Sequence, residues 1–147
     1  MRALGSTLTV SLTLALALGC GPSAPDPILG VRLGMTPAQV RDRFGTAAGG
    51  TFRGEAQGED FALVWAPPEA SRSPVRAARH EFHVGQLVAM RLTLDPAAPA
   101  AQGPPVELTE LSVLTRERVG SDVALTWLAR ACPTHAEEVR RRIQEHR

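Results

Sequence analysis

The chain contains 147 residues, with 16 basic and 15 acidic side chains, so its formal net charge is only +1. Every basic residue is Arg, and this near-balance excludes a strong long-range attraction to nucleic acid, which we do not expect as a partner. The length suits a single domain, and 44% hydrophobic residues are enough to build a core.

The N-terminal segment has the features of a bacterial secretory signal. Arg2 supplies a positive charge, Leu8–Leu18 forms an apolar run, and Gly19 places a small residue directly before Cys20. The ending Ala-Leu-Gly-Cys resembles the lipobox of bacterial lipoproteins, in which the cysteine is lipidated and becomes the first residue of the mature chain. We therefore predict a signal peptide over residues 1–19 and a lipid anchor on Cys20. An ordinary cleaved signal and an uncleaved membrane anchor are the alternatives.

A short tether is expected after the lipid site. Residues 20–27 contain three prolines, which prevent a helix and disfavour a central strand. We expect a semi-rigid spacer here and one domain over residues 28–147. A lipidated Cys20 cannot pair with Cys132, whereas an unmodified Cys20 could form a disulfide with it.

The clearest local signal predicts a helix over Pro37–Phe44. Thr36 can cap it with its hydroxyl, and Gln39 stands three residues later, which completes a capping box. Proline suits the first helical position because its missing N–H leaves no hydrogen bond unmade. Gly45 is expected to end this helix in the left-handed conformation.

Alternating apolar residues predict several strands after this helix. Gly85 predicts a tight turn over His83–Gln86, and Pro-rich and Ala-rich loops are expected over Ala66–Ser73 and Asp95–Pro105. The segment from Val106 to Arg118 fits neither period well, and we favour a strand in its second half. The predicted strands are Gly50–Arg53, Asp60–Trp65, Arg76–His83, Gln86–Leu94, Leu111–Arg118 and Asp122–Ala129.

A second helix is expected at the C-terminus. Thr134 and Glu137 have the spacing of a capping box, and Val139 and Ile143 form a narrow apolar stripe. The predicted fold is therefore α+β, with an antiparallel sheet of four to six strands packed against an N-terminal and a C-terminal helix. We expect the helices to cover one face of the sheet.

One longer pattern extends from the first helix into the strands. It consists of Gly34-Met35-Thr36, Val40 and Gly45, then the aromatic residues Phe61 and Trp65, and later Phe82 before the Gly85 turn. This pattern resembles the SmpA/OmlA (BamE-like) envelope lipoproteins over residues 28–65, and more loosely to residue 94.

The resemblance implies a fold, a location and a role. Members of that family are small outer-membrane lipoproteins with two helices on a three-stranded antiparallel sheet, and they act as non-enzymatic accessory subunits in outer-membrane protein assembly. The related β-lactamase-inhibitor-like domains bind proteins. An outer-membrane anchor with the domain facing the periplasm would follow. Both family helices precede the sheet, whereas here one is expected at each end, and residues 107–147 have no counterpart.

Cys132 and His135 are the strongest candidates for chemistry. A thiol just before a helix N-terminus has a lowered pKa, and a histidine three residues later could act as its base. The sequence identifies no third residue to orient this histidine. The other reading of Cys132 is a small buried residue between a strand and a helix.

The remaining polar clusters predict no cofactor or metal site. His80 and His83 point to opposite faces of a strand, so they cannot share one metal ion. Arg140–Arg142 and Arg147 alternate with acidic residues, which favours a solvated helix face. Trp65 and Trp127 lie on apolar strand faces and are expected in the core.

Two functional hypotheses therefore follow from the sequence. The first is a membrane-anchored, non-enzymatic envelope module that binds other envelope proteins through its sheet or loops. The second is a thiol-dependent enzyme or redox protein that uses Cys132 and His135, which requires an exposed thiol in a cleft.

Overall fold

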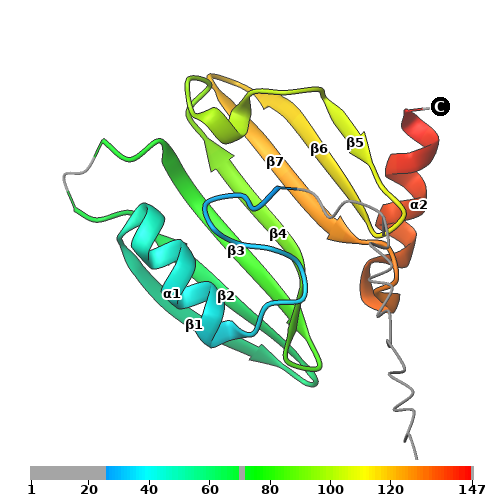
Figure 1. Ribbon diagram of the computed structural model, residues 1–147, viewed down its shortest axis with the longest axis horizontal. Helices are drawn as coiled ribbons and strands as arrows, with labels where there is room; N and C mark the ends of the chain where they lie inside the picture. Colours follow the sequence, from blue (N-terminus) through cyan, green and yellow to red (C-terminus); the bar gives the residue numbers. More distant parts are fainter. Residues whose placement is uncertain (1–25, 70–71, 147) are drawn as a thin grey trace, which may run out of the picture.

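The computed structural model describes residues 26–69 and 72–146. The predicted signal peptide, Cys20 and Arg147 lie outside the described residues. The described chain forms an α+β domain with one antiparallel sheet and two α-helices (Figure 1). No helix in these residues is both long enough and apolar enough to cross a bilayer.

The sheet has seven strands rather than the expected four to six, in the order β1-β2-β3-β4-β7-β6-β5. The strand that raised the number is β5, which the sequence did not reveal because it has three residues and shows no periodicity. The strands are β1 (Thr51–Gln57), β2 (Asp60–Ala66), β3 (Val75–His83), β4 (Gln86–Leu94), β5 (Val106–Leu108), β6 (Ser112–Val119) and β7 (Asp122–Ala129).

The predicted tight turn between β3 and β4 is confirmed. His83 and Gln86 pair across it, and its two central residues, Val84 and Gly85, have φ values of 49° and 72°. Two consecutive positive φ values are typical of the turn that matches the twist of paired strands. Gly85 adopts this conformation easily, but the branched side chain of Val84 does not. The hairpin tip therefore holds a strained residue whose apolar side chain is 74% exposed.

Helix α1 (Pro37–Ala48) begins as predicted and ends later. The Gln39 N–H donates to Thr36 Oγ1 at 3.3 Å, and the Thr36 N–H donates to Gln39 Oε1 at 2.9 Å, which completes the capping box. The prediction that Gly45 ends the helix was wrong. Gly49, with a φ of 66°, ends it and donates its N–H to the Gly45 carbonyl. A glycine within a helix is tolerated, so the helix continues until the chain needs a positive φ.

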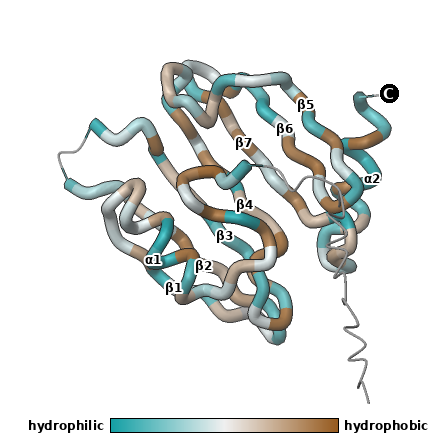
Figure 2. The backbone as a smooth tube through the Cα atoms, viewed as in Figure 1, coloured by the Kyte–Doolittle hydropathy of each residue, from teal (hydrophilic) through white to brown (hydrophobic). Residues whose placement is uncertain are grey.

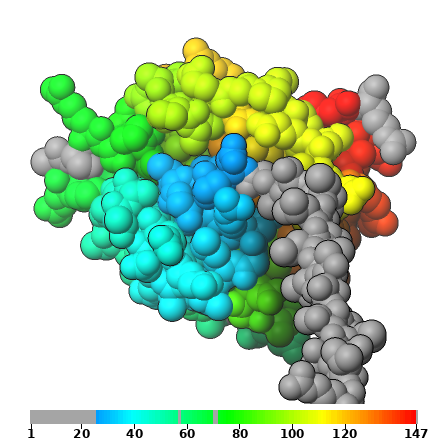
Figure 3. Space-filling model, in the orientation of Figure 1, coloured from blue at the N-terminus to red at the C-terminus, as the bar shows by residue number. Residues whose placement is uncertain are grey.

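The larger core lies between one sheet face and the layer formed by α1 with residues 26–35. Figure 3 shows this layer in blue and cyan on one face of the molecule. Val40 and Phe44 are the buried residues of α1, and both are fully covered. Trp65 and Trp127 are each 2% exposed in this core, which confirms their predicted role. Figure 2 shows the hydrophobic positions along the strands, in brown.

Helix α2 (Ala136–Glu145) packs on the opposite face, so the prediction that both helices cover one face was wrong. Val139 and Ile143 contact Ala89, Val113 and Leu128 there. These three strand residues alternate with buried residues that face the larger core. Because this part of the sheet is apolar on both faces, it needs cover on both sides.

The predicted capping box of α2 does not form. A single 3-10 turn over Pro133–His135 precedes the helix, and its N-cap residue is His135 rather than Thr134. No side chain caps the first turn of α2. The His135 side chain is instead directed at the sheet, where it bonds to β3. This tertiary contact sets the start of the helix one residue later than the local pattern predicted.

Candidate functional site

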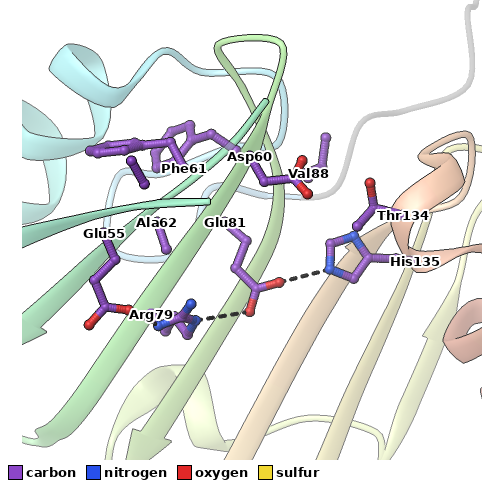
Figure 4. A pocket seen from close by; sticks show the side chains of 11 residues that line it. Glu55, Asp60, Phe61, Ala62, Arg79, Glu81, Val88, Thr134 and His135 are labelled. Atoms are coloured by element: carbon purple, nitrogen blue, oxygen red, sulfur yellow. Dashed lines mark hydrogen bonds and ion pairs between the residues drawn. The ribbon is translucent and has the colours of Figure 1, made fainter. Parts of the chain in front are cut away.

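A pocket of about 430 Å³ opens where β1, β2 and β3 approach the turn before α2 (Figure 4). It lies on the same face of the sheet as α2, away from α1. Apolar side chains form part of its wall, and titratable side chains from four elements converge on it. The residues on which its chemistry depends are Glu55, Asp60, Arg79, Glu81 and His135.

Glu81 of β3 is the central carboxylate of this pocket. Arg79 Nε and Arg91 Nε both donate to its Oε1 atom, at 3.3 and 3.1 Å. His135 Nε2 lies 2.7 Å from the other oxygen, Oε2, and Figure 4 shows Arg79 and His135 approaching the carboxylate from different sides. The hydrogen bond to His135 and the charge of Arg91 outweigh burial and lower the pKa of Glu81 to about 2. The same bond raises the pKa of His135.

The charged network continues from Glu81 to α2. Arg91 of β4 donates two hydrogen bonds to Glu138, at 3.0 and 2.7 Å, in the bidentate geometry that arginine and carboxylate favour. These bonds raise the pKa of Arg91 and lower that of Glu138 to about 2. Arg142 bonds to Glu138 and, across to β6, to Thr115 and Glu117. A connected set of ion pairs therefore fixes α2 to the sheet.

The arginines of α2 are partly misassigned by the sequence pattern. Arg141 is exposed and pairs with Glu145 at the expected spacing, at 3.5 Å. The Arg142 side chain, however, is only 11% exposed because it lies between α2 and β6. The prediction of a solvated helix face was therefore wrong for Arg142, which is a structural residue.

Cys132 and His135 are close in the chain but do not open into one cleft. Cys132 is 5% exposed and does not line the pocket, whereas His135 does. His135 Nδ1 is buried and has no hydrogen-bond partner among the described residues. The neighbouring Cys132 thiol contributes to the raised pKa of His135. Burial raises the pKa of the thiol, but interactions with His135 and Thr134 outweigh burial and lower it.

The structure supplies the orienting residue that the sequence did not reveal. Glu81 holds His135 from a strand 54 positions earlier in the chain. Carboxylate, imidazole and thiol therefore follow one another as in a nucleophilic site. The thiol end of this series is covered, so a ligand in the pocket meets the imidazole but not the sulfur.

We expect Cys132 to resist a bulky thiol reagent in the folded protein near neutral pH, because its sulfur is covered. Denaturant should expose it, and modification should then go to completion. The measurement is the time course of labelling followed by mass spectrometry. Labelling of the folded protein at the rate of a free thiol would contradict the expectation and would favour the thiol-dependent alternative.

The carboxylates of the pocket are neutralised from within the chain. Glu55 accepts from Arg79 at 2.8 Å, and Asp60 lies 2.8 Å from His83 Nδ1. Glu81 is bonded to His135. A charged small molecule would have to displace these partners, whereas a protein surface could cover the pocket and leave them in place.

Comparison with protein-family models, with curated proteins and with solved structures finds no match. The likeness to the SmpA/OmlA family therefore stays a prediction, and the function has to be argued from this chain's own geometry.

The two histidines of β3 are separated, as their spacing predicted. His80 is fully buried beneath α1, with its ring 4.7 Å from that of Phe44, whereas His83 lies near the opposite face beside Asp60. Within the described part of the chain, neither ring nitrogen of His80 has a hydrogen-bond partner. Among residues 26–69 and 72–146, no three His, Cys, Asp or Glu side chains form a group that could hold a metal ion.

Proposed function

We propose that this chain is a lipid-anchored, non-enzymatic module of a bacterial cell envelope that binds another protein on the sheet face beside α2. Cys20 would carry the anchor, and the outer membrane facing the periplasm is the location that the family resemblance favours. The observation that carries the binding role is a shallow trough of about 390 Å³ on that face. Val64, Ala77, Thr93 and Ala124, from four strands, line the trough together with Arg79 and Arg91 of the charged network.

The trough is suited to a helix of the partner. Within the described residues, α2 lies at the β5–β7 end of the sheet and no helix lies over β2 and β3 on this face (Figure 1). An apolar sheet face is normally buried under a packed layer, and small side chains let a helix approach closely.

Crosslinking in the native envelope tests the binding role. A photoreactive amino acid at Ala77, which is exposed in the trough, should give a discrete protein adduct. The same group at Ala47, which is exposed on α1, should not. In the variant with the photoreactive group at Ala77, the further substitution Val64→Arg should fill the trough and abolish the adduct. The absence of an adduct at Ala77, or an equal adduct at Ala47, would reject this surface.

The anchor is tested separately by Cys20→Ala. We expect this change to release the protein from the membrane fraction, measured by fractionation and immunoblotting. A Cys132→Ser variant is the matched control, because it removes the other thiol and should leave retention unchanged. Full membrane retention of Cys20→Ala would reject the lipid anchor without bearing on the trough.

A further inference from the structure

The two edges of the sheet differ in how well they are protected. β5 has three residues and follows Pro104 and Pro105, so it offers little backbone for another strand. β1 has seven residues, contains no proline and pairs with β2 without a bulge. Among the described strands it has no neighbour on its other side. A long and regular edge of this kind is a template for another strand.

The register identifies the backbone groups that β1 directs outward. Gln57 and Asp60 close a two-residue turn, so they form a hydrogen-bonded pair with β2. Bonding then alternates along the strand, which leaves the N–H and C=O groups of Phe52, Gly54 and Ala56 facing away from the sheet. A strand that pairs with this edge must bond to these three residues.

The sequence of β1 is complementary to itself in this register. Consider two copies that pair antiparallel about a two-fold axis at Gly54. Each residue whose backbone N–H and C=O groups face outward then lies opposite a residue of the other copy whose groups also face outward. Arg53 of one copy then lies opposite Glu55 of the other, twice over. Opposite charges at facing positions stabilise a strand pair, whereas like charges oppose it.

The surroundings of Gly54 and Glu55 suit this arrangement. Gly54 itself places no side chain on the axis, and a Cβ atom there would lie 3.0 Å from the Phe61 ring and 3.9 Å from Arg41 Nη2. Arg79 donates to one oxygen of Glu55, and Arg53 of the same chain donates to the other. The second bond would be exchanged for Arg53 of the other copy. Arg41, whose guanidinium lies over the Phe52 ring, is exposed and would turn outward.

We propose that two copies of this chain associate through β1, antiparallel and centred on Gly54, to form one continuous sheet. This interface is a second surface, at the β1 edge of the sheet rather than in the trough beside α2, and its test does not depend on the partner of that trough. Closed two-fold pairing is the commonest symmetry of protein oligomers, and it removes both free edges at β1.

The test uses the full chain in detergent and sedimentation equilibrium. The wild type should show a concentration-dependent dimer. Arg53→Glu makes the edge acidic and Glu55→Arg makes it basic, so each variant alone should dissociate about tenfold more readily or be monomeric. An equimolar mixture of the two should recover the dimer, because an acidic edge then meets a basic one.

A backbone variant tests the same edge without altering charge. Ala56→Pro removes an outward N–H that makes no bond within the sheet, so the protein should fold and remain monomeric. Circular dichroism melting checks the fold of every variant. The proposal is overturned if the wild type is monomeric at about 100 μM. That result is also expected if the edge accepts a strand of another protein instead. Folded single variants whose mixture stays monomeric would overturn the proposed register.

Discussion

Replacing Arg91 by Ala should lower the free energy of unfolding by about 3 kcal/mol. Arg91 is the only residue of the network that bonds to both Glu81 and Glu138. Those carboxylates are 22% and 21% exposed, and each would keep its charge with one cationic partner fewer. Removing one partner of a largely buried pair costs more than the pair itself contributes, because the remaining charge is poorly solvated. Urea unfolding near pH 7 measures the difference.

Two variants give this prediction its control. Arg141→Ala removes an exposed pair on the same helix and should cost less than about 0.5 kcal/mol. The double variant Arg91→Met with Glu138→Met removes both charges and should recover much of the loss. If Arg91→Ala were as mild as Arg141→Ala, the network would not be what holds α2 to the sheet.

Acid should destabilise the domain through His80 before it affects the carboxylates. Burial lowers the pKa of His80 to about 4 from an ordinary 6.5, so the unfolded chain binds the proton first as the pH falls. Stability is therefore retained above pH 6.5 and lost between about 6.5 and 4. The shift corresponds to about 3 kcal/mol. Urea unfolding between pH 4.5 and 7 measures this loss.

The variant His80→Leu isolates this residue. It should be more stable than the wild type at pH 7, because two unpartnered ring nitrogens leave the core, and its stability should change much less between pH 7 and 4.5. Glu81 and Glu138 lose their contributions only as the pH falls from 4.5 to about 2. An acid dependence in His80→Leu equal to that of the wild type would contradict the assignment.

The two histidines whose pKa is raised change the stability with pH in the opposite direction to His80. The pKa values of His135 and His83 are raised, by Glu81 and Asp60 respectively, so their contributions are present below pH 6.5 and are lost as the pH rises through the folded values. His83 contributes less, because its partner Asp60 is 44% exposed. The domain should therefore be most stable near pH 6.5, between the acid loss at His80 and the loss at His135.

Local signals predicted the fold where a few neighbouring residues decide the conformation. The capping box of Thr36 and Gln39 needs only contacts between residues three apart, and Gly85 supplies the turn that joins β3 to β4. The same reasoning failed at Thr134, where the bond from His135 to Glu81 overrides the local cap. It also failed for the placement of the helices, because the pattern within a strand does not say which helix covers which face.

The candidate site was less predictable because its contacts cross the chain. Glu81 meets His135 over 54 positions, and Arg91 meets Glu138 over 47. A single Glu on an alternating strand is ordinarily a solvent-facing residue, so nothing local marks Glu81 as a centre. Two charged residues two positions apart in β3, at 79 and 81, were the local signal for a polar strip on the sheet.

The strand order also determines how the chain can assemble. β1 to β4 follow one another as simple hairpins, and so do β5 to β7, so both groups form from contacts between neighbours in sequence. The two groups meet only where β4 pairs with β7, and closing that seam encloses residues 95–121. Because loop closure carries an entropic cost, we expect the two hairpin groups to form early and the β4–β7 seam to form last. A chain held back at that step would expose two half-sheets, each with an unpaired strand at the break.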